Sequence, residues 1–266
     1  MDPHQVADIF NARAERYVND DWHRRYAEQL VRVTPLRPGD RVLDAGTGTG
    51  FAAYAIARRV GPTGHVLGVD LSPAMLEQAR SVRDAALLTN VEWLEADVTD
   101  LCHLAASTFD AVVCSAGLLY MPVAKALREW HRLLTSDGVA AFSTMKVGSP
   151  LAGRIFRECA ARFGLDLDDP AESLGTEDRC RHVLEDAGFD RLRVISGRVD
   201  FETLDPTLAW EANFRAAGHA AARALSAERQ HVLRQQFIDA LNQARRADLA
   251  ASSRADVIFA IGQRAR

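Results

Sequence analysis

The stretch VLDAGTGTG, residues 42–50, decides the fold of this chain. Its apolar beginning is typical of a buried strand, and the three glycines Gly46, Gly48 and Gly50 indicate a tight turn into a helix. Glycine suits such a turn because it adopts left-handed backbone angles without strain and lets a ligand approach the main chain. The stretch therefore predicts a strand–turn–helix unit that holds a nucleotide.

Further short apolar segments follow this unit and alternate with helical segments. Strands are expected at residues 41–46, 65–70, 91–97, 109–116 and 139–145. They are continuous apolar runs rather than alternating ones, which indicates burial on both faces and hence a parallel sheet with helices on either side. The predicted fold class is α/β, a Rossmann-like, doubly wound and mostly parallel sheet with a helical cap.

The late part of the chain loses the strand rhythm, because a long helical block spans residues 205–247 before one more apolar strand. We therefore expect this block to form a cap together with the N-terminal helices, which break near Asn19-Asp20-Asp21. The expected segments are N-terminal cap helices at 1–36, a cofactor-binding core at 37–147, a helical insertion at 148–187, a core strand at 188–203, a helical cap at 204–252 and a final core strand at 253–266.

The composition bounds the class of protein. The chain has 266 residues, is 48% hydrophobic and carries a formal net charge of −4, which suits one large α/β domain and disfavours a nucleic-acid scaffold. Its four cysteines show no CxxC spacing, which predicts reduced thiols and no metal site. No apolar run reaches the roughly 18 residues of a membrane span, and the polar start lacks a signal-peptide core, so a cytoplasmic location is expected.

The position of Asp44 indicates which nucleotide cofactor the turn would bind. The third glycine of the dinucleotide fingerprint would fall at Phe51, and a carboxylate beside the turn would repel a pyrophosphate. S-adenosylmethionine has no phosphate and carries an ammonium and a sulfonium, so the same loop suits it. Asp70 ends the second strand, where it would bind ribose hydroxyls, and Asp97 ends the third near the adenine edge. Plain turn roles are the alternative, but three aspartates at the ends of successive strands favour a cofactor site.

At these residues the sequence resembles the class I S-adenosylmethionine-dependent methyltransferases. It looks most similar to their small-molecule branch, which includes ubiquinone/menaquinone C-methyltransferases and natural-product methyltransferases. The matching segments are VLDAGTGTG (42–50), VLGVDLSPAMLEQAR (66–80), VEWLEADVTDL (91–101), FDAVVCSAGLLYMP (109–122), LREWHRLLTSDGVAAFST (127–144) and, more loosely, NARAERY (11–17) and ADVIFAIGQR (255–264). The resemblance implies a seven-stranded sheet whose final strand is antiparallel.

The resemblance also implies roles for individual residues around S-adenosyl-L-methionine. It places Asp44 and the loop Gly46-Thr47-Gly48 under the methionine moiety, Asp70 on the ribose, Leu71 and Met75 near the adenine, Asp97 and the Val98 amide at the adenine edge, the Ser115 carbonyl at the ammonium, and Tyr17 over the methionine tail. The match fades after residue 146, where the acceptor would be chosen.

The acceptor site is less determined by the sequence. Tyr120 follows the fourth predicted strand and is the best-placed polar group for catalysis, although a half-buried packing role is an equal alternative. Phe156, Trp210 and Phe214 are candidate substrate-binding residues because some aromatic side chains of a cap must line its pocket, while core packing is the plainer alternative. None of the eight histidines is expected to face the site.

The sequence therefore predicts methyl transfer to a small, apolar or aromatic metabolite, as in secondary metabolism, with the acceptor atom (oxygen, carbon or nitrogen) unresolved. The alternatives are a non-methylating reaction on the same fold, a cofactor-binding protein without catalysis, an RNA or protein acceptor, and an NAD-dependent oxidoreductase. The expected partner is a small molecule rather than nucleic acid or membrane, and a homodimer stays open.

Overall fold

The computed structural model describes residues 3–17, 21–85, 88–202 and 205–265. Their contacts divide the chain into two compact units. Unit 1 comprises Met1–Thr144, Thr176–Ser196 and Ile258–Arg266, and unit 2 comprises Met145–Gly175 and Gly197–Val257.

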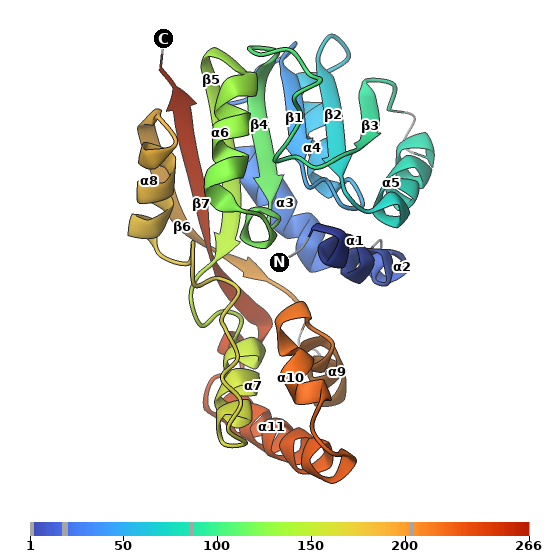
Figure 1. Cartoon of the computed structure of the whole chain (residues 1–266), viewed down its shortest axis with the longest axis vertical. Coiled ribbons are helices and arrows are strands. Elements are labelled where there is room, and N and C mark those ends of the chain that lie inside the picture. The colour runs from blue at the N-terminus through green and yellow to red at the C-terminus, as the bar shows by residue number, and fades with distance from the viewer. Residues whose placement is uncertain (1–2, 18–20, 86–87, 203–204, 266) are drawn as a thin grey trace. The chain divides into compact units, whose positions relative to one another are not determined.

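A seven-stranded sheet organises the fold, with the strand order β3-β2-β1-β4-β5-β7-β6 (Figure 1). The strands are β1 (Arg41–Ala45), β2 (His65–Asp70), β3 (Val91–Glu95), β4 (Phe109–Ser115), β5 (Leu134–Met145), β6 (Phe189–Asp200) and β7 (Arg254–Arg264). The pairs β1–β2, β2–β3, β1–β4 and β4–β5 are parallel. The predicted fold class is confirmed, and the strand order reverses between β1 and β4, where ligands of open α/β sheets bind.

Strand β5 begins earlier than the sequence predicted. The pattern indicated a strand from Val139, whereas β5 begins at Leu134 and pairs there with Phe109 of β4. The next pairing joins Ala111 to Val139, so residues 135–138 form a bulge in which Asp137 has a φ of 65°. A polar bulge of this kind hides the first part of a strand from an apolar pattern.

Helices cover both faces of the sheet in unit 1. They are α1 (Pro3–Asn11), α2 (Ala14–Tyr17), α3 (Asp21–Val33), α4 (Phe51–Val60), α5 (Pro73–Ala85), the short η1 (Leu118–Tyr120), α6 (Val123–Leu133) and α8 (Glu177–Asp186). Helices α3 and α4 pack together on one face, and α6 and α8 pack together on the other (Figure 1). Side chains such as Leu30, Ile56 and Trp130 are fully buried between helices and sheet.

The grouping of the segments differs from the sequence expectation. Helices α1, α2 and α3 belong to unit 1 rather than to the unit of the late helical block: α1 and α2 contact α5, and α3 contacts α4 and β4. Helix α8 also belongs to unit 1. Such groupings depend on tertiary packing, which a local pattern does not contain. Most of the break predicted near residues 19–21 lies outside the described residues.

Unit 2 has a helical core of its own. It contains α7 (Leu151–Ala161), α9 (Pro206–Phe214), η2 (Ala217–His219), α10 (Ala220–Arg223), α11 (Ala227–Ala247) and η3 (Ala250–Ser253). Phe156 lies 5.4 Å from Trp210 and 5.8 Å from Phe237 between ring centroids, distances typical of favourable aromatic pairs. Asp205 and Ser226 cap α9 and α11 with their side-chain oxygens, so the helical block predicted at 205–247 consists of several helices.

The packing of β2 predicts the effect of adding one methyl group. A Cβ at Gly68 would lie 2.5 Å from ring carbons of Trp93 and 3.0 Å from Thr47 Oγ1. We expect Gly68→Ala to lower the free energy of unfolding by about 1–3 kcal/mol, because overpacking forces neighbouring groups to move. Urea unfolding measures the change. Gly218→Ala is the control, since a Cβ there meets no atom within 4 Å. Equal losses in the two variants would contradict the packing argument.

Candidate functional site

The turn between β1 and α4 has the backbone that its glycines predict. Gly46, Gly48 and Gly50 have φ values of 69°, 54° and 88°, a region that favours glycine. The amides of Gly46 and Thr47 both donate to the carbonyl of Val69 on β2, at 2.9 and 3.0 Å. A Cβ at Gly48 would meet no atom within 4 Å, so the middle of the turn faces open space.

Asp44 lies beneath this turn at the end of β1 and is only 1% exposed. Its Oδ2 accepts a hydrogen bond of 2.5 Å from Thr47 Oγ1, whereas its buried Oδ1 has no hydrogen-bond partner among the described residues. Burial raises the pKa of Asp44 to about 7, the Thr47 hydroxyl and the Ala53 amide oppose this rise, and the nearby charge of Asp70 adds to it. A buried unsatisfied acceptor costs about 1–3 kcal/mol, so Oδ1 is suited to a cationic donor from a ligand.

Asp70 connects the turn to the next helix. Its Oδ2 accepts from the Gly48 amide at 2.8 Å and its Oδ1 from the Ser72 amide at 2.9 Å. Burial raises the pKa of Asp70, while these amide bonds hold it down. Each carboxylate oxygen keeps a second lone pair, so Asp70 can still accept from ribose hydroxyls.

The first helix reaches the same region through Asn11, which the sequence analysis did not single out. Asn11 Oδ1 accepts from Ser72 Oγ at 2.6 Å and from the Ala74 amide at 3.3 Å. Ser72 Oγ in turn accepts from the amide of Met75, whose side chain is 1% exposed. Helix α1 is thus bonded to the start of α5, next to Leu71 and Met75, the predicted adenine contacts.

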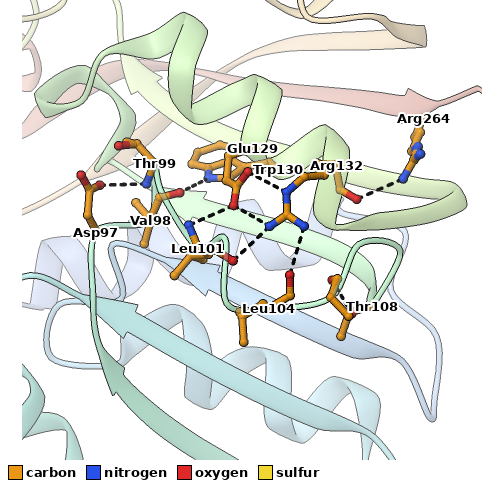
Figure 2. Close-up of polar contacts among 11 residues, drawn as sticks. Asp97, Val98, Thr99, Leu101, Leu104, Thr108, Glu129, Trp130, Arg132 and Arg264 are labelled. Atoms are coloured by element: carbon orange, nitrogen blue, oxygen red, sulfur yellow. Dashed lines mark hydrogen bonds and ion pairs between the residues drawn. The ribbon is translucent and has the colours of Figure 1, made fainter.

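The loop after β3 is held by α6, as Figure 2 shows. Asp97 Oδ1 accepts from the Thr99 amide at 2.8 Å, and the indole N–H of Trp130 donates to the Val98 carbonyl at 3.2 Å. Because Trp130 is fully buried, it fixes the backbone beside the Val98 amide. The two predicted adenine-edge residues therefore lie on a loop whose shape is set from another helix.

An ion pair on α6 holds the rest of that loop (Figure 2). Glu129 accepts from the Leu101 amide at 2.9 Å and from Arg132 at 2.7 Å, and Arg132 donates to the carbonyls of Leu101 and Leu104 at 3.0 Å each. The hydrogen bond from Arg132 is the main cause that lowers the pKa of Glu129. The sequence analysis missed this pair, and its only signal was the i,i+3 spacing of Glu129 and Arg132 within LREWHRLL.

The segment after β4 packs against the glycine turn. A Cβ at Gly46 would lie 3.0 Å from Met121 Cε and 3.9 Å from Gly117 Cα. Ser115 ends β4 and pairs with Ser143 of β5, whose Oγ accepts from the Ala116 amide at 3.1 Å. Ser115 and Tyr120 therefore belong to a segment that lies next to the turn.

Phe10 of α1 brings the two predicted tyrosines together. Its ring contacts Tyr120 edge-on at 5.2 Å and Tyr17 at 6.3 Å between centroids. Tyr17 Oη also lies 3.1 Å from His23 Nε2, so one histidine belongs to this cluster. Burial raises the pKa of Tyr120 although the charge of Arg13 opposes it, so Tyr120 is a neutral phenol at neutral pH.

The three predicted substrate-binding residues belong to unit 2, and Phe156 differs from Trp210 and Phe214 in its surroundings. Phe156 has no exposed surface and stacks on His219 at 4.7 Å, so it packs in the core instead of lining a pocket. Trp210 and Phe214 stack at 4.9 Å and line a groove of about 500 Å³. Aromatic residues at helical spacing look alike in sequence, which is why only the structure separates them.

Within residues 3–17, 21–85, 88–202 and 205–265, no cluster of three or more His, Cys, Asp or Glu side chains could hold a metal ion. Over the same residues, no helix is long and apolar enough to cross a membrane.

Comparisons with known proteins agree with this geometry. A family model described as a methyltransferase domain matches residues 36–188. The chain is 36% identical over 145 residues to the 2-phytyl-1,4-naphtoquinone methyltransferase of Nostoc sp., a match that covers 52% of this chain and 63% of that relative. It is 30% identical over 213 residues to the ubiquinone/menaquinone biosynthesis C-methyltransferase of Ectopseudomonas mendocina, covering 71% and 82%. A solved S-adenosylmethionine-dependent methyltransferase from Aquifex aeolicus has 24% identity and a TM-score of 0.55, covering 70% and 91%.

The titration of Asp44 predicts how cofactor affinity depends on pH. Its pKa of about 7 means that the carboxyl is protonated in the free protein below that pH, and a cationic amino group must then displace the proton. We expect affinity for S-adenosylhomocysteine to fall as the pH decreases below 7, by up to about tenfold per pH unit, and to level off above it. Calorimetric titration across this range is the measurement. Asp44→Asn should bind weakly with no such slope, and a flat profile in the unaltered protein would contradict the assignment.

Asp70 can be tested by substitution. Asp70→Ala removes a charged acceptor and should lower the affinity for S-adenosylhomocysteine about ten- to a hundredfold, because hydrogen bonds to charged groups contribute roughly 1.5–3 kcal/mol. The exposed Asp190 on β6 provides the control variant, Asp190→Ala, which should bind as the unaltered protein does. A folded Asp70→Ala protein with unchanged affinity would remove Asp70 from the cofactor site.

Proposed function

The chain belongs to the class I S-adenosylmethionine-dependent methyltransferases, and from this membership we propose that it transfers a methyl group from the cofactor to a small, flat, apolar acceptor of the quinone type. The observation that carries the proposal is the buried, unsatisfied Oδ1 of Asp44 beneath an open glycine turn. The acceptor class rests on two relatives, whose names refer to a naphthoquinone and to ubiquinone and menaquinone.

The residues around the turn fit the cofactor by their chemistry. Bound there, S-adenosylmethionine would supply a methyl group that its sulfonium activates. Asp44 and the Ser115 carbonyl would accept from the ammonium, and Asp70 would accept from the ribose hydroxyls. The remaining proposed contacts are the loop Gly46-Thr47-Gly48 with Gly50, Leu71 and Met75 at the adenine, Asp97 and the Val98 amide at its edge, and Tyr17 at the methionine tail.

Tyr120 is the proposed catalytic residue. Because burial keeps its phenol neutral, it would donate a hydrogen bond to the acceptor oxygen rather than remove a proton from it. Such a bond stabilises the more electron-rich form of a quinol and fixes its orientation. Since positioning alone can lower a barrier by roughly 7–11 kcal/mol, orientation by Tyr120 and its aromatic neighbour Phe10 is a sufficient role.

An assay with reduced naphthoquinones of different chain lengths tests the proposed function. We expect a product heavier by one methylene group, formed only when S-adenosylmethionine is present, as measured by mass spectrometry. Tyr120→Phe should lower turnover while its affinity for S-adenosylhomocysteine stays unchanged, because the substitution removes one donor near the acceptor and leaves the turn intact.

Other outcomes of the assay would overturn the proposal. Conversion of the acceptor without a gain in mass would indicate a non-methylating reaction on the same fold. Methyl transfer from labelled cofactor to RNA or protein, with none to quinols, would indicate a macromolecular acceptor. Full turnover by Tyr120→Phe would reduce Tyr120 to a packing residue.

A further inference from the structure

The groove in unit 2 lies between α9, α10 and the first half of α11. All three helices belong to unit 2 (Figure 1), and α9 packs against α11. Its volume of about 500 Å³ is within the range of small-molecule pockets. The residues that define its chemistry are Trp210, Phe214, Arg215, Arg223, His231 and Arg234.

One wall of the groove is aromatic and rigid. The rings of Trp210 and Phe214 stack at 4.9 Å with an interplanar angle of 20°. Trp210 is only 4% exposed because its other neighbours are Phe156 and Phe237 of the core, so its position is fixed by packing. A fixed flat wall of this kind favours a planar ligand, because little conformational freedom is lost on contact.

The charge of the groove is opposite to that of the whole chain. Three arginines and one glutamate line it, while the chain carries a net charge of −4. Arg215 is paired with Glu211 at 3.1 Å, and Arg223 donates to the carbonyls of Phe214 and Ala216 at 2.7 and 3.0 Å. The guanidinium groups of Arg215 and Arg223 therefore already have partners in the walls of the groove.

Arg234 is different. It lies on α11 and is partly buried, yet it makes no ion pair or hydrogen bond with another residue in the described part of the chain. An arginine that loses water without gaining a partner is poised for an anion, and the planar guanidinium matches a carboxylate in a bidentate manner. The groove thus combines a cationic group without a partner and an aromatic wall.

We propose that this groove is a binding site for a small planar aromatic carboxylate, held by Arg234 at its charged end and, on its ring, by Phe214, which Trp210 supports from behind. The site lies wholly within unit 2 and is defined without reference to methyl transfer. Its ligand is anionic, whereas the quinone-type acceptor proposed above is neutral, so the two proposals can fail separately.

Titration of the full chain with 2-naphthoate tests the site, with heat and tryptophan fluorescence as the two readouts. We expect saturable binding of one naphthoate per chain. The uncharged 2-naphthamide should bind about tenfold or more weakly, since it lacks the charge that Arg234 recognises, and inorganic phosphate should bind weakly because it has no ring.

Two matched variants complete the test. Arg234→Met should weaken naphthoate binding about tenfold or more, while Arg246→Met, which removes an exposed arginine from the last turn of the same helix, should change it less than about twofold. Affinity for S-adenosylhomocysteine should be unchanged in both variants, which shows that each is folded. Equal binding of naphthoate and naphthamide to the unaltered protein, no saturable binding, or equal losses in the two variants would each overturn the proposal.

Discussion

The buried carboxylate of Asp44 is the constraint on which the site depends. A carboxyl group that is 1% exposed and leaves one oxygen unsatisfied lowers stability, and its raised pKa reflects that cost. The bond from Thr47 to Oδ2 holds the side chain in place but leaves Oδ1 unsatisfied. In the proposed site, a ligand that brought a cationic donor to Oδ1 would satisfy this oxygen, so the free energy lost in the unliganded protein would contribute to cofactor affinity.

The rest of unit 1 keeps this arrangement rigid. Gly68 lets the ring of Trp93 lie directly on β2, and Asp70 holds the Gly48 amide and so the shape of the turn. Bonds from other helices then fix the neighbouring segments, with Asn11 of α1 bonded to Ser72 and Trp130 of α6 bonded to Val98. The proposed cofactor contacts come from several strand ends, and each of these ends is fixed by a different part of the chain.

Part of the fold and of the candidate site could be predicted from the sequence. The predictable features depend on residues that are close together in the chain, whereas the others depend on contacts between distant residues. The glycine turn, Asp44 and the parallel sheet depend on the local order of residues, so the sequence pattern predicts them. The Glu129–Arg132 clamp joins α6 to a loop about thirty residues earlier, and the Asn11–Ser72 bond joins residues 61 apart, so no local pattern contains them. The early start of β5 was hidden by its polar bulge. Phe156 and Trp210 share the same spacing and chemistry, and only packing makes one a core residue and the other a wall.

The two proposed sites differ in the sign of the charge that they offer to a ligand. Unit 1 presents two mutually repelling carboxylates, Asp44 and Asp70, to a ligand that carries positive charge. The groove of unit 2 presents Arg234, without a partner among the described residues, to a ligand that carries negative charge. Asp44 belongs to unit 1 and Arg234 to unit 2, and within the described part of the chain each lacks the opposite charge that its proposed ligand would bring.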